Sequence, residues 1–267
     1  KENGIRKPTK IRKIKLLSLI LVTLISTIVI IATVALNYAD DFGGNPTSHD
    51  SPNFNDGIFQ NYEQTDLQSD EVSSWDLFTD YLVSDDCRTP NENLPSEEFD
   101  VIDLEAGEIS VSWFGHSTIL MRSNNLTLIT DPVFSNSGAG PLSIGPSPFP
   151  YEHSYEIDDL PPIDYVFISH DHYDHLDMST VKSLKDSSFY VPLGIKNHLL
   201  EWGVEDENIE EFDWYDESTI SDDLDVAFTP SRHFSGRGIG DSHATLWGSW
   251  VFKLHDKSIY FSGDTGY

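Results

Sequence analysis

Three of the ten histidines in the chain fall within six residues, and a carboxylate lies among them. The segment runs from Ser169 to His175 and contains His170, His172 and Asp174. Imidazole nitrogens and carboxylate oxygens are ligands that suit zinc. Ligands spaced at i, i+2, i+4 and i+5 cannot share one face of a helix, so they must converge from a loop. The pattern therefore predicts a metal site and not a solvated loop with coincidental histidines.

Two single residues stand in comparable places further along the chain. His233 follows an apolar run at 226–229 and opens a glycine loop, and Asp264 follows another apolar run at 258–261. A histidine at a strand end is more often a surface residue than a ligand, and an Asp beside a Gly is usually a turn former. His233 and Asp264 are candidate ligands only because the same chain also contains the histidine-rich segment.

The elements that must position these residues follow from the apolar pattern. Short strands are expected at 109–113, 118–121, 126–129 and 165–168. The last of these runs directly precedes the histidine-rich segment and is typical of a strand buried on both faces. Helices are expected over Met178 to Lys185, with Asp177 as N-cap, and over Ile195 to Trp202, which Gly203 stops. Strands that alternate with short helices predict an α/β layered domain.

The charge of the chain excludes one class of partner. The 267 residues carry 16 Lys and Arg against 45 Asp and Glu, and seven of the basic residues lie in the first fifteen positions. The rest of the chain therefore repels polyanions, so no nucleic-acid partner is expected. The hydrophobic fraction of 38% is too high for a disordered chain. The single cysteine, Cys87, cannot form an internal disulfide and is read as an incidental thiol.

An uncharged apolar run from Leu16 to Leu36 predicts a transmembrane helix. The alternative is a cleaved signal peptide, whose apolar core is shorter, about 7–15 residues. The basic residues before the run place the N-terminus in the cytoplasm and the rest of the chain outside. We expect a basic N-terminus at 1–15, a transmembrane helix at 16–36, an acidic linker at 37–100 and, at 101–267, the domain that carries the histidine-rich segment.

The linker contains one apolar patch with near-helical spacing. It predicts a short amphipathic helix over Glu71 to Ser84 inside an otherwise extended tether. The helix could dock on the domain or contact the membrane. Docking is favoured because its polar face is acidic, whereas interfacial helices favour Lys and Arg.

The ordered motifs S-H-D-H-Y-D-H-L-D, T-P-S-R-H and G-D-T-G-Y resemble those of the metallo-β-lactamase-fold hydrolase superfamily. Further motifs, W-F-G-H-S-T, T-D-P-V-F, L-P-P-I-D, V-P-L-G and L-W-G-S-W, are similar to the branch that contains N-acylphosphatidylethanolamine-hydrolysing phospholipase D and its bacterial relatives. The resemblance runs from about residue 52 to the last residue. It implies a four-layer αββα sandwich with two zinc ions at one edge.

The resemblance also implies a role for each ligand. His170, His172 and His233 match the ligands of the first zinc, and Asp174 and His175 match those of the second. The bridging carboxylate matches Asp264, which with Asp174 and His175 is expected to act in catalysis. Related di-iron oxidoreductases carry Glu at the position of His172, so the histidine favours zinc. The family has one more histidine ligand beyond G-D-T-G-Y, so we expect a sandwich incomplete at its C-terminal end and leave the activity of this chain open.

Other residues near these motifs have weaker roles. His116 is expected beside the metals or as a buried structural histidine, and Asp131 is expected to orient a ligand histidine or cap a turn. Aromatic residues that could line an acyl-chain cleft, or belong to the core, are Phe149, Tyr151, Tyr173 and Trp247. The histidines expected at the surface are His153, His198, His243 and His255.

Together these features predict a membrane-anchored dinuclear zinc hydrolase that cleaves phosphodiesters. The expected substrate is an N-acylated phospholipid, with release of phosphatidic acid, and the membrane and the lipid are the expected partners. One alternative is a lactonase or sugar-phosphate hydrolase of the same fold. An alternative of another class is a non-catalytic anchored binding module. The sequence leaves the oligomeric state open.

Overall fold

A computed structural model of the protein describes residues 10–37, 40–45, 47, 49–63, 73, 75–76, 79, 89–123, 126–135, 139–140, 145–238 and 240–266. The chain forms two compact units, Lys1–Ala39 and Asp40–Tyr267. Almost all of the helix expected over Glu71 to Ser84 lies outside the described residues, as does Cys87.

The first unit is one long apolar helix, α1 (Lys10–Asn37). Its window Leu17–Val34 has a mean hydropathy of 2.7, and none of that window is buried. The hydroxyl of Thr27 donates to the carbonyl of Thr23 at 2.9 Å, so this polar group is satisfied within the helix. By length and composition α1 can cross a membrane, a test that a signal sequence would also pass.

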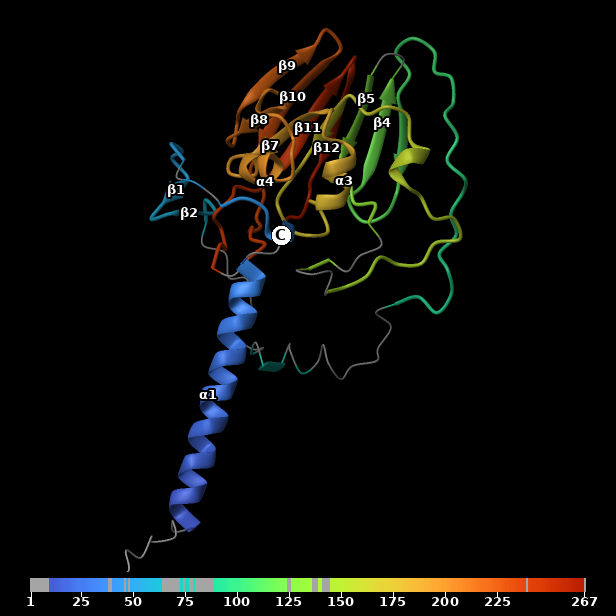
Figure 1. The fold of residues 1–267 in the computed structure, drawn as a ribbon. Coiled ribbons are helices and arrows are strands. Elements are labelled where there is room, and N and C mark those ends of the chain that lie inside the picture. Colours follow the sequence, from blue (N-terminus) through green and yellow to red (C-terminus); the bar gives the residue numbers. More distant parts are fainter. Residues whose placement is uncertain are drawn as a thin grey trace, which may run out of the picture. The chain divides into compact units, whose positions relative to one another are not determined.

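The second unit is built on two β-sheets, which Figure 1 shows as two layers. The larger sheet has the order β3-β4-β5-β6-β7-β8, antiparallel from β3 to β5 and parallel from β5 to β8. Its strands are β3 (Ser110–Trp113), β4 (Ile119–Ser123), β5 (Leu126–Thr130), β6 (Tyr165–Phe167), β7 (Ser188–Pro192) and β8 (Ile209–Phe212). The smaller sheet is antiparallel, in the order β12-β11-β10-β9. Its strands are β9 (Glu217–Ser221), β10 (Leu224–Thr229), β11 (Ser249–Leu254) and β12 (Lys257–Phe261).

Alternation along β6 divides the hydrophobic core in two. Phe167 points between the sheets, where its ring centroid lies 5.1 Å from that of Trp250 and 4.8 Å from that of Phe252. Val166 and Ile168 point the other way and pack beneath two helices, α3 (Met178–Ser183) and α4 (Lys196–Glu201). The expected strand buried on both faces is therefore confirmed. Helix α3 ends two residues earlier than expected, and α4 is shorter by one residue at each end. Short 3-10 helices occur at Ile157–Asp159 and Asp206–Asn208.

The beginning of the expected tether belongs to the second unit. Phe59, in the small hairpin of β1 (Phe54–Asn55) and β2 (Ile58–Phe59), is completely buried in the core between the sheets. Upstream, the 3-10 helix η1 (Asp40–Phe42) accepts a hydrogen bond at the carbonyl of Asp40 from Trp202 Nε1, at 2.8 Å. The described residues between 40 and 63 thus differ from the extended linker expected from their acidic composition, because apolar side chains among them, such as Phe59, pack into the core.

Candidate metal centre

The predicted ligands lie in loops that leave the carboxyl ends of strands in both sheets. The histidine-rich loop follows β6, while His233 follows β10 and Asp264 follows β12. Asp177 caps α3 as predicted, because its carboxylate accepts a hydrogen bond from Thr180 N at 3.1 Å. Gly263 has a φ of +54°, and a Cβ there would lie 2.6 Å from the Cβ of Ser169. Only a glycine lets the Asp264 loop approach the histidine-rich loop this closely.

The first cluster consists of His170, His172 and His233. His170 Nε2 lies 2.9 Å from His172 Nδ1, and His233 Nε2 lies 3.2 Å from the same His172 Nδ1. A tetrahedral zinc has its ligand nitrogens about 2.0–2.1 Å away, which sets the ligands about 3.3 Å apart. Three neutral imidazoles at this spacing fit one such ion.

A second cluster, which adjoins the first, consists of His116, His175, Asp264 and the neighbouring Asp174. His175 Nε2 lies 3.3 Å from Asp264 Oδ1, and the other carboxylate oxygen of Asp264 lies 3.8 Å from His233 Nε2. Asp264 therefore faces both clusters, as a bridging ligand would. His116 Nε2 lies 3.0 Å from His175 Nε2 and 3.3 Å from Asp174 Oδ2. The donor set of histidine and aspartate and its spacing indicate a dinuclear metal site.

Buried hydrogen bonds behind the clusters fix the tautomers of two histidines. Asp131, wholly buried, accepts from Ser169 N at 2.7 Å, from Ser169 Oγ at 2.6 Å and from His175 Nδ1 at 2.7 Å. Because Ser169 Oγ gives its only proton to Asp131, the 2.9 Å bond between Ser169 Oγ and His170 Nδ1 must have the ring nitrogen as donor. Both histidines thus carry a proton on Nδ1 and direct Nε2 toward the clusters.

The pKa values of the histidines in the two clusters are shifted in opposite directions. Burial lowers the pKa of His170 well below its usual value, and burial together with neighbouring His172 lowers the pKa of His233 to about 4. For His175 the effect of burial is outweighed by the hydrogen bond and charge of Asp131, so its pKa rises to about 10. His170 and His233 are therefore neutral near pH 7, as ligands must be, whereas ion binding at His175 must release a proton.

Asp171 is a structural residue of the site that the sequence did not single out. It is buried, and its carboxylate accepts from Gly236 N and from Thr245 Oγ1, each at 2.7 Å. Burial would raise its pKa, but the interaction with His198 and these hydrogen bonds outweigh burial and lower the pKa to about 2. His198 was expected at the surface and is in fact buried, because the first turn of α4 packs against Gly43.

Arg237 ties both ends of the histidine-rich loop to the glycine loop. Its buried guanidinium donates through Nη1 to the carbonyls of Asp171 and Leu176, at 2.8 and 2.7 Å. Nε and Nη2 donate to the carbonyl of Asp41 at 3.1 and 2.9 Å, and the guanidinium lies 3.9 Å above the ring of Tyr173. The sequence contained no signal for this role beyond the position of Arg237 among glycines.

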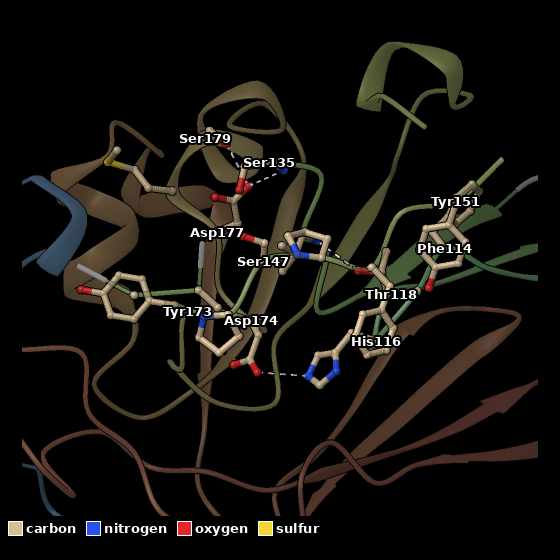
Figure 2. A pocket seen from close by; sticks show the side chains of 18 of the residues that line it. Phe114, His116, Thr118, Ser135, Ser147, Tyr151, Tyr173, Asp174, Asp177 and Ser179 are labelled. Carbon is tan, nitrogen blue, oxygen red and sulfur yellow. Dashed lines mark hydrogen bonds and ion pairs between the residues drawn. The ribbon is translucent and has the colours of Figure 1, made fainter. Parts of the chain in front are cut away.

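A cavity of about 640 Å³ opens beside the second cluster, and Figure 2 shows His116 and Asp174 facing each other in its wall. Of the aromatic residues expected at a cleft, Phe149, Tyr151 and Tyr173 line this cavity. Trp247 does not line it. The Trp247 side chain is buried and donates to Asn61 Oδ1 at 3.2 Å. Asn61 in turn donates to the carbonyl of His233 at 2.8 Å, so Trp247 supports the first cluster from within the core.

Three other histidines were expected at the surface. His153, His243 and His255 are partly exposed and lie apart from the two clusters, in contrast to buried His198.

Comparison with known proteins shows relatives over most of the chain. An uncharacterized protein of Mycobacterium tuberculosis is 38% identical over 228 residues, which cover 82% of this chain and 59% of that protein. The N-acyl-phosphatidylethanolamine-hydrolyzing phospholipase D 1 of Caenorhabditis elegans is 30% identical over 212 residues, covering 74% of this chain and 56% of the relative. The chain therefore spans less than two thirds of the length of these relatives.

The chain is also similar to a solved structure and to one protein-family model. CmlA, a diiron beta-hydroxylase from Streptomyces venezuelae, is similar over 59% of this chain and 30% of its own, with 24% identity and a TM-score of 0.46. The family described as the beta-lactamase superfamily domain matches residues 127–267, which include both clusters except His116. Because this match covers more than half of the chain, the protein belongs to the β-lactamase superfamily.

Proposed function

We propose that the protein is a membrane-anchored dinuclear zinc hydrolase that cleaves the phosphodiester bond of an N-acylated phospholipid and releases phosphatidic acid. One observation carries the proposal: His116 and Asp174 belong both to the second cluster and to the wall of a large cavity with aromatic lining. Relatives in Caenorhabditis elegans and Saccharomyces cerevisiae bear the name of an N-acyl-phosphatidylethanolamine-hydrolyzing phospholipase D, which supports this substrate class.

The chain's own residues would divide the work at the reacting centre. The first ion would be held by His170, His172 and His233, and the second by Asp174 and His175, with Asp264 shared between them. When bound, two such ions would lower the pKa of a water molecule and so supply hydroxide as the nucleophile near neutral pH. Asp131 and Ser169 keep the ligand rings oriented through the bonds to Nδ1.

The cavity and α1 are the features that support a lipid substrate. Apolar and aromatic side chains such as Trp113, Phe114 and Phe149 line the cavity and suit acyl chains. Anchoring through α1 would keep the enzyme at a bilayer and raise the effective concentration of its substrate without any further contact. The basic residues of the first fifteen positions would lie on the cytoplasmic side, and the catalytic unit would face outward.

A substrate comparison tests the proposal. The full chain, loaded with zinc, is incubated with N-acylphosphatidylethanolamine in mixed micelles and, separately, with an acyl lactone, and Asp264→Asn serves as the inactive control. We expect release of phosphatidic acid by the parent chain and at least a hundredfold slower release by the variant. Turnover of the lactone alone would favour the lactonase alternative. Absence of turnover with both substrates, together with near-zero bound zinc, would favour a binding module.

A further inference from the structure

We infer that His116 is itself a ligand of the second metal ion, through Nε2, beside Asp174, His175 and Asp264. The inference rests on the proposed dinuclear centre and deepens it. His116 comes from the loop between β3 and β4, before the segment matched by the family, so neither the motif after β6 nor the family match assigns it.

Convergence of donor atoms is the first observation. The ligand atoms of His116, His175 and Asp264 all lie within 4.8 Å of one another, as do those of the first cluster. The 3.0 Å between His116 Nε2 and His175 Nε2 falls between the 2.9 and 3.2 Å spacings of the ligand nitrogens in the first cluster. This spacing suits two ligands of one ion.

Ring orientation is the second observation. The rings of His116 and His175 lie edge to face, with centroids 4.7 Å apart and planes at 72°. The pair His170 and His172 has the same arrangement, at 4.6 Å and 80°. The Nδ1 bond to Asp131 holds the ring of His175 with Nε2 directed toward His116. Ligation lets both nitrogens use their lone pairs.

The backbone holds His116 in place at a cost. Its φ is +43°, a region that costs a residue other than glycine about 1–2 kcal/mol. The carbonyl of His116 accepts from Trp113 Nε1 at 2.9 Å, and Thr118 Oγ1 donates to the carbonyl of Asp131 at 2.8 Å. The loop is thus tied to the residue that orients His175. About half of the His116 side chain (52%) remains exposed, so burial does not account for this placement.

Metal titration of His116→Ala tests the inference. Zinc affinities of the full chain and the variant are measured by competition with a chromophoric chelator, without substrate. His255→Ala is the matched control, because His255 also has a positive φ, of +54°, and its Nδ1 bonds to Asp223, apart from both clusters. We expect His116→Ala to bind the first ion unchanged and the second at least about a hundredfold more weakly, beyond the loss typical of residues behind a ligand. His255→Ala should bind both ions like the parent chain.

A second variant separates ligation from simple hydrogen bonding. In His116→Gln an amide can still donate a hydrogen bond to Asp174 but is a poor zinc ligand. Recovery of the second ion's affinity in His116→Gln, or two undiminished affinities in His116→Ala, would overturn the inference. A parent chain that binds fewer than two ions would instead contradict the proposed dinuclear centre, so the two failures are distinguishable. In the cobalt form, a changed visible absorption of the second ion in His116→Ala is the expected independent signature.

Discussion

Asp131→Asn should weaken metal binding although Asp131 touches neither proposed ion. The wild-type carboxylate accepts three hydrogen bonds, from Ser169 N, Ser169 Oγ and His175 Nδ1. An asparagine keeps one oxygen for Ser169 N and places an NH2 group against the other two donors. To relieve this clash, His175 must give up its Nδ1 proton, and the neutral ring then keeps its proton on Nε2, the nitrogen that faces the second cluster. The substitution thus blocks a ligand without changing the shape of the site.

The size of the effect follows from the kind of contact that is lost. Loss of a partner that orients a metal-ligating histidine weakens metal affinity by about 10–100-fold, or about 1.4–2.7 kcal/mol. Asparagine tolerates the positive φ of position 131, which is +39°, so backbone strain should add little. We expect the loss to fall on the ion that His175 binds.

Chelator competition measures the prediction, with circular dichroism as a check that the fold is kept. Asp164→Asn is the matched control, because that exposed carboxylate also accepts a backbone hydrogen bond, from Thr127 N at 2.8 Å, but lies away from the clusters. Two zinc affinities in Asp131→Asn equal to those of Asp164→Asn would refute the argument that the His175 tautomer is set by Asp131.

Three further predictions concern other parts of the molecule. Arg237→Met should lower the free energy of unfolding in urea by about 3 kcal/mol, since it leaves buried carbonyls without donors; a loss below about 1 kcal/mol would contradict this role. The fold lowers the pKa of Asp171 from 3.8 to about 2, so the ionised carboxylate stabilises the folded state. This stabilisation is fully present above pH 4 and is lost as the pH falls through 2. With a chelator present, the stability gap between the parent chain and Asp171→Asn should therefore shrink from about 2 kcal/mol at pH 5 toward zero at pH 2; a gap independent of pH would contradict the assignment. Deletion of residues 1–39 should leave turnover of a soluble phosphodiester unchanged and reduce turnover on bilayers at least about tenfold, and equal loss on both substrates would count against an anchoring role.

Local patterns predicted the elements that carry the ligands. Strand β6 was predictable because its apolar run has no polar face, and the start of α3 was predictable because Asp177 caps it. The candidate ligands could be named because three histidines and an aspartate share one loop. Each of these signals lies within a few residues of the feature it predicts.

The residues that hold the ligand loops in place, such as Asp131 and Arg237, were not predictable from local patterns. Asp131 lies 38 residues before Ser169, and Arg237 lies 66 residues after Asp171. Such contacts depend on the register and order of the strands, which local patterns do not contain. His198 was misplaced for the same reason: a polar residue in a short helix reads as exposed until the segment around Gly43 covers it.

The number of metal ions bound per chain tests the central claim most directly. The full chain is purified without chelators, equilibrated with zinc, freed of excess metal and analysed by inductively coupled plasma mass spectrometry. The account predicts about two zinc ions per chain and, because Asp264 faces both clusters, a clear loss from both sites in Asp264→Asn. A parent chain with essentially no bound zinc, or an Asp264→Asn variant that keeps both ions, would contradict it.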